Sequence, residues 1–189
     1  MRWVTRADVH LDRVASPWLI RRFIDPEAEF VFIDPDGPWP TDAVSFAMPG
    51  AEIGMHDEDG TTFDKLLARY ELTDPVLLDI ADGVRAGVHQ VLGGDLGDLS
   101  QESVSLGFGL LALSEGIMLR HPSDQRNLDH SMVIYDALYA YFWGRHRDPR
   151  TGAATFWDRI AELRSAWPEN VPGAESSNSQ LNTPGVVRR

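Results

Sequence analysis

Arginines are concentrated near the amino end of a chain that is otherwise strongly acidic. The 189 residues carry a formal net charge of −12, yet residues 1–22 hold five arginines and two aspartates, a local balance of +3. Guanidinium groups bind oxyanions through paired hydrogen bonds, and they bind buried carboxylates in the same way. We predict that four of these arginines form one site for a small oxyanion at the edge of a small sheet: Arg6, Arg13, Arg21 and Arg22. The alternative is that they form structural ion pairs with buried carboxylates.

A second group of polar residues lies in the segment GAEIGMHDEDGTTFDKLL, residues 50–67. Carboxylates with one imidazole can hold Mg²⁺, Mn²⁺, Fe²⁺ or Zn²⁺, so Glu52, His56 and Asp64 are candidate metal ligands. Such a metal would suit an enzyme with redox or hydrolytic chemistry. The spacing matches neither H-E-x-x-H nor a calcium-binding loop. The alternative is a solvated acidic turn before a helix, with Asp64 stabilising the helix N-terminus.

Several classes of protein are excluded or disfavoured by what the sequence contains. The absence of cysteine excludes disulfides, thiolate metal sites and thiol nucleophiles. Neither a G-x-S-x-G elbow nor a nucleotide-binding glycine loop occurs. The acidic balance disfavours direct binding to nucleic acid. Because no apolar run approaches about 18 residues, we expect no membrane span, and a cytoplasmic location is the default.

The elements that must position these residues follow an α+β order. Strands are predicted over residues 2–6, 29–34 and 43–48, with a helix between the first two that begins with Ser16 as N-cap and Pro17 at its first position. Helical periodicity then predicts five helices, over residues 61–71, 74–92, 100–119, 125–143 and 153–167. The fold class is therefore a small N-terminal β-sheet covered by helices, followed by a mostly helical C-terminal part. We expect one domain over residues 1–167 and a disordered tail over 168–189.

One of these helices carries a carboxylate in an apolar row. Glu115 continues the helical spacing of Val104, Phe108 and Leu111 within residues 100–119. A carboxylate on a buried apolar face needs a partner, so we expect an arginine from the N-terminal group to pair with it.

The sequence resembles the C-terminal domain of the ChrB chromate-resistance family over about residues 3–143. Three segments carry the resemblance: WVTRADVHLDRVASPWLIRRFIDPEAEFVFID, GAEIGMHDEDGTTFDKLL and, in the long helix, DALYAY. The matching residues are Trp3, Arg6, Asp12, Arg13, Pro17, Trp18, Arg21, Arg22, Phe23, Asp25, Glu52, His56, Phe63 and Asp64. The resemblance implies a bacterial protein that acts in chromate-responsive regulation or limits chromate accumulation. It brings no catalytic assignment.

This chain departs from the family pattern in two ways. Members often carry cysteine where this chain has Ser16 and Thr61, so reduction of chromate by a thiol is excluded. Longer relatives have an additional N-terminal region, so we do not expect regulation through DNA contact by this chain alone.

Three hypotheses follow. We favour a module that binds a small anion of the chromate, sulfate or phosphate class through the arginines. The second hypothesis is the metal-dependent enzyme around His56. The third is a regulatory partner domain whose arginines make only structural ion pairs.

Overall fold

A computed structural model of the protein describes residues 1–34, 37–147 and 155–168. The chain divides into two compact units, Met1–Arg150 and Thr151–Arg189. The predicted α+β class is confirmed, because a three-stranded sheet near the amino end is followed by a largely helical part. The predicted tail, 168–189, lies outside the described residues except for Pro168, and the single domain over 1–167 stays a prediction.

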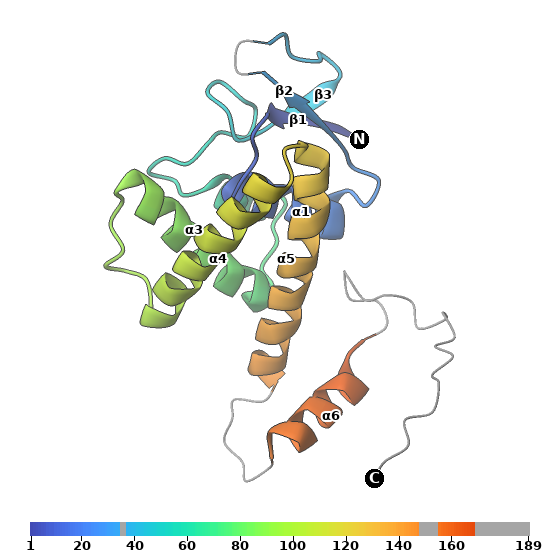
Figure 1. Ribbon diagram of the computed structural model, residues 1–189, viewed down its shortest axis with the longest axis vertical. Coiled ribbons are helices and arrows are strands. Elements are labelled where there is room, and N and C mark those ends of the chain that lie inside the picture. The colour runs from blue at the N-terminus through green and yellow to red at the C-terminus, as the bar shows by residue number, and fades with distance from the viewer. Residues whose placement is uncertain (35–36, 148–154, 169–189) are drawn as a thin grey trace. The chain divides into compact units, whose positions relative to one another are not determined.

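The sheet is small and entirely parallel (Figure 1). Its strands are β1 (Arg2–Arg6), β2 (Glu29–Ile33) and β3 (Ala43–Ser45), in the order β2-β1-β3. The central strand β1 is buried at Trp3, Val4 and Thr5, as expected for a strand with a neighbour on each side. The third strand was predicted over residues 43–48, but β3 ends at Ser45. Phe46 forms a single bridge to Ile53, and the positive φ of Ala47, 55°, ends the extended backbone.

The helix between β1 and β2 begins earlier than predicted. Helix α1 spans Asp12–Leu19, so Ser16 and Pro17 lie inside it rather than at its start. Leu11, with a φ of 49°, precedes the helix, and the Asp12 carboxylate accepts hydrogen bonds from backbone amides of another helix. These long-range bonds fix the start of α1, and Pro17 is tolerated there at the loss of one helical hydrogen bond. A π-helical turn, η1 (Ile20–Ile24), continues α1.

Four further helices complete the described part of the first unit, and each begins within one residue of its predicted start. They are α2 (Thr62–Arg69), α3 (Pro75–Leu92), α4 (Gln101–Arg120) and α5 (Asp124–Arg147). Thr61, Asp74 and Ser100 cap α2, α3 and α4 through side-chain oxygens, as expected from their residue types. In the second unit, α6 (Phe156–Ala166) is capped by Thr155.

Helix α1 lies at the centre of the core of the first unit. Its Trp18 is fully buried, stacks parallel to Phe63 of α2 and contacts Tyr135 and Tyr139 of α5. Helices α3 and α4 approach closely, because Gly107 of α4 lies against the backbone of Ala86 and Gly87. The core therefore holds α1, α2, α3 and α5 around one aromatic cluster, with α4 against α3.

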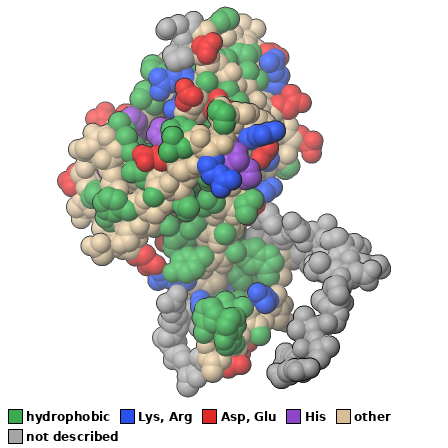
Figure 2. Space-filling model, in the orientation of Figure 1, with side chains coloured by type: hydrophobic (Ala, Val, Ile, Leu, Met, Phe, Trp, Pro, Cys, Tyr) green, Lys and Arg blue, Asp and Glu red, His purple; other side chains and the backbone are tan. Residues whose placement is uncertain are grey.

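Helix α4 exposes much of its apolar surface. Phe108 and Leu119 are 59% and 82% exposed, and apolar side chains reach solvent over this part of the molecule in Figure 2. Among the described residues, α4 is the one helix long and apolar enough, by length and composition, to cross a membrane. The prediction that Glu115 lies on a buried face is wrong: Glu115 is exposed, and Ser114 is the buried neighbour.

Candidate anion-binding cavity

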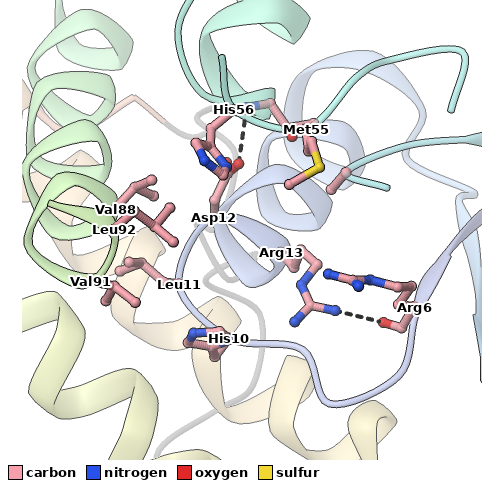
Figure 3. A pocket seen from close by; sticks show the side chains of 12 residues that line it. Arg6, His10, Leu11, Asp12, Arg13, Met55, His56, Val88, Val91 and Leu92 are labelled. Atoms are coloured by element: carbon pink, nitrogen blue, oxygen red, sulfur yellow. Dashed lines mark hydrogen bonds between the residues drawn. The ribbon is translucent and has the colours of Figure 1, made fainter. Parts of the chain in front are cut away.

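A cavity of about 170 Å³ lies between the end of β1, the start of α1 and the end of α3 (Figure 3). Val88, Val91 and Leu92 of α3 form an apolar wall, and the facing wall carries charged and histidine side chains. By a similar measure one water needs about 10–15 Å³, so the cavity has room for a small ion. The polar lining consists of Arg6, His10, Asp12, Arg13, His56 and Thr62.

Arg13 is held in place by neutral acceptors. Its guanidinium donates to the backbone carbonyls of Arg6 at 3.3 Å, Ala7 at 3.0 Å and Asp8 at 3.0 Å. Burial, and then the neighbouring charge of Arg6, lower the pKa of Arg13, while nearby aspartates oppose this shift. Because carbonyls fix the group without cancelling its charge, Arg13 contributes a positioned positive charge to the cavity wall.

Arg6 lies beside Arg13, with the two guanidinium groups next to each other in Figure 3. Within the described part of the chain, no carboxylate pairs with either group. The Nε atom of Arg6 is buried and has no hydrogen-bond partner. A buried donor without an acceptor costs about 1–3 kcal/mol, so the free protein carries this cost beside the cavity.

His10 adds a second unpartnered atom to the same wall. Its Nδ1 is buried without a hydrogen-bond partner. Burial, and then the charge of Arg13, lower the pKa of His10, and Glu115 acts in the opposite direction. An anion in the cavity would reverse the effect of Arg13 and favour protonated His10.

The Asp12 carboxylate also lines the cavity, but its oxygens serve other groups. It accepts hydrogen bonds from the backbone amides of Thr62 at 2.9 Å and Phe63 at 3.1 Å, and from the hydroxyl of Ser16 at 3.1 Å. Burial raises the pKa of Asp12, and the amide donors at the start of α2 oppose the rise. Asp12 therefore anchors α2 against α1 rather than pairing with the arginines.

Of the four predicted arginines, Arg6 and Arg13 meet at the cavity, and Arg21 and Arg22 lie elsewhere. Arg21 stacks over the ring of Phe30 at 5.0 Å and donates to a backbone carbonyl. Arg22 forms a paired interaction with Asp136 of α5, at 2.9 and 2.7 Å. Eight residues of helix separate Arg13 from Arg21 by roughly 12 Å, which is too far for one small anion. The ion-pair alternative thus describes Arg22.

The three predicted metal ligands have separate surroundings. Glu52 pairs with Arg69, and Asp64 caps α2 with Thr61 while pairing with Arg85 at 2.7 Å. His56 lines the cavity. Among residues 1–34, 37–147 and 155–168, no group of three histidine or carboxylate side chains is arranged to hold a metal ion. The side chains of Glu52, His56 and Asp64 therefore do not form a common metal site in this structure, and a divalent metal bound by them stays a prediction.

Two parts of the cavity were not in the predicted site. His10 had a sequence signal, since it lies between Arg6 and Arg13. The apolar wall from α3 had no sequence signal, because Val88 and Leu92 have the spacing of ordinary core residues in an amphipathic helix.

Comparison with known proteins identifies the family. A family model described as "ChrB, C-terminal domain" matches residues 3–142. The chain belongs to this ChrB family. Protein ChrB of Cupriavidus metallidurans (strain CH34) is 34% identical over 141 residues, which are 75% of this chain and 40% of that relative. The resemblance noted in the sequence is confirmed, and the cavity lies within the matched ChrB region. No solved structure shows a significant match.

Proposed function

We propose that this ChrB-family chain is a chromate-resistance-type protein that binds a small oxyanion of the chromate, sulfate or phosphate class through Arg6 and Arg13. Membership of the ChrB family supports the chromate-resistance part of the proposal. The observation that carries the binding part is the pair of adjacent guanidinium groups of Arg6 and Arg13, neither of which has a carboxylate partner among the residues that the structure describes.

The electrostatics of the cavity suit a doubly charged anion. A protein with a net charge of −12 repels anions at long range, so binding needs a local concentration of positive charge. Arg6 and Arg13 supply that charge, and the apolar wall formed by α3 lowers the local dielectric. The oxygens of the anion would accept hydrogen bonds from the terminal nitrogens of Arg6, which are not among its buried atoms. Binding would thereby offset the repulsion between the two arginines.

Isothermal titration with chromate, sulfate and phosphate tests the proposal. We expect heat from at least one anion, loss of that heat in Arg6→Met, and retention in Arg2→Met. Arg2 is a matched control because it lies on the same strand and pairs with Asp42 at the surface, so both variants lose one positive charge. If millimolar anion gives no heat, or if both variants lose binding equally, the cavity is not the binding site.

A further inference from the structure

The outward face of α4 has a pattern of large and small side chains that the proposed anion site does not explain. Exposed positions recur every three or four residues and therefore share one face of the helix. Ala112 lies at the middle of this row, with Phe108 and Leu119 as its large members. We call this row the α4 face: Gln101, Ser105, Phe108, Ala112, Gly116 and Leu119.

We propose that the α4 face binds the α4 face of a second copy of this chain, with the two helices antiparallel and crossing at Ala112. In that register Phe108 of one copy lies opposite Gly116 of the other, and Leu119 lies opposite Ser105. Each large side chain then meets a small one, and the two-fold axis repeats both contacts. A Cβ added at Gly116 would meet nothing within 4 Å in the single chain, so space for a partner's ring is open there.

The charges at the two ends of α4 fit the same arrangement. Around its N-terminus lie the exposed acids Asp95 and Asp98, while Glu102 already pairs with Arg145 of the same chain, and around its C-terminus lie the exposed bases Arg120 and Arg126. Arginine and histidine side chains gather beside the exposed apolar surface in Figure 2. Antiparallel pairing brings each acidic end toward the partner's basic end. The helix dipoles are then also antiparallel, which is favourable.

A lipid bilayer is a poorer occupant for this face. The opposite side of α4 is committed to protein, since Gly107 packs on α3 and the Ser114 hydroxyl accepts a hydrogen bond from the Leu11 amide at 2.6 Å. Lipid could not surround the helix unless α4 left this fold. The exposed row also includes Ser105 and has Glu115 at its edge, which suit a protein contact better than hydrocarbon.

Cysteine cross-linking of the full chain is the sharpest test, because the natural sequence has no cysteine. Ala112→Cys should form an intermolecular disulfide on mild oxidation, since residues on the two-fold axis approach within disulfide range. Leu78→Cys, at an exposed apolar position on α3, is the matched control and should stay monomeric under the same conditions. Equal cross-linking of the two variants would overturn the proposal.

Sedimentation equilibrium supplies the second readout. The wild-type chain should reach a mass of about 42 kDa, twice 21.1 kDa, at high micromolar concentration. Phe108→Ser and Gly116→Leu should each raise the dimer dissociation constant by about 100-fold or more, because each dimer carries the change twice. Their monomer stability should be unchanged or higher. A wild-type monomer at all concentrations, a dimer that tolerates Phe108→Ser, or a monomer that instead floats with lipid vesicles through Phe108 would each overturn the proposal.

Discussion

Replacing Arg6 with methionine separates a binding role from a structural role. Methionine keeps much of the aliphatic packing of the arginine stem and removes the guanidinium. In the free protein this removes a buried Nε that has no acceptor and a charge that lies beside Arg13. An unsatisfied buried donor costs about 1–3 kcal/mol, and Arg6 is only partly buried, so we take the lower end. The free energy of unfolding should therefore stay constant or rise by up to about 1 kcal/mol.

With anion bound, the wild type should instead be more stable than Arg6→Met. An anion at 100 times its dissociation constant stabilises the wild-type fold by about 2.7 kcal/mol. For a chain of this size, 1 kcal/mol corresponds to about 2–4 °C in Tm, so the wild-type Tm should rise by about 5–10 °C. Arg6→Met should lose most of this rise while keeping a Tm in buffer at or above that of the wild type.

The measurement is thermal unfolding by circular dichroism, with and without saturating chromate or sulfate, for wild type, Arg6→Met and Arg2→Met. Arg2→Met controls for the change in net charge. The reasoning is refuted if Arg6→Met lowers the Tm in buffer by several degrees and keeps the full rise with anion. Arg6 would then be a structural residue, and the anion would bind elsewhere.

Three further changes test other parts of the structure. Arg22→Met should destabilise the fold by about 1–3 kcal/mol, because it leaves the Asp136 carboxylate partly buried without its arginine partner. Urea unfolding measures this loss, and anion titration should show unchanged binding. Gly107→Ala should lower the free energy of unfolding, measured with urea, by about 1–3 kcal/mol, because its Cβ would lie 2.6 Å from a backbone nitrogen of α3. Gly109→Ala is the control: its Cβ would meet nothing within 4 Å, so at low protein concentration it should raise the free energy of unfolding by up to about 1 kcal/mol. The lowered pKa of His10 means that stability present above about pH 6.5 is lost as the pH falls through the folded-state pKa. An anion favours protonated His10, so sulfate should bind more tightly at pH below 6.5 and with proton uptake; titration in buffers of different ionisation enthalpy measures this, and a pH-independent affinity contradicts it.

The sequence was most informative where structure depends on local interactions. Three predicted helix ranges begin at Thr61, Asp74 and Ser100, and these residues cap α2, α3 and α4, because capping needs only a short polar side chain and the amides two or three residues later. The strand β2 followed from its β-branched and aromatic residues. These elements account for the predicted α+β class and for the order of strands and helices along the sequence.

Prediction failed where a distant segment decided the outcome. The start of α1 is fixed at Asp12 by amides about 50 residues later in the chain, so the Ser16–Pro17 pair was misleading as a helix start. Arg22 finds its carboxylate 114 residues away on α5, and over that distance no spacing assigns Asp136 to Arg22 rather than to another arginine. The arginine cluster was therefore predicted with four members where the cavity holds two.

The contrast between Arg13 and Arg22 explains why composition alone could not pick out the site. Both guanidinium groups donate hydrogen bonds to acceptors of the protein, so the presence of such bonds does not distinguish the two arginines. The acceptors differ: carbonyls hold Arg13 and leave its charge in place, while the Asp136 carboxylate neutralises Arg22. An arginine held by carbonyls, beside a second arginine that pairs with no carboxylate among the described residues, is the arrangement that can attract an anion.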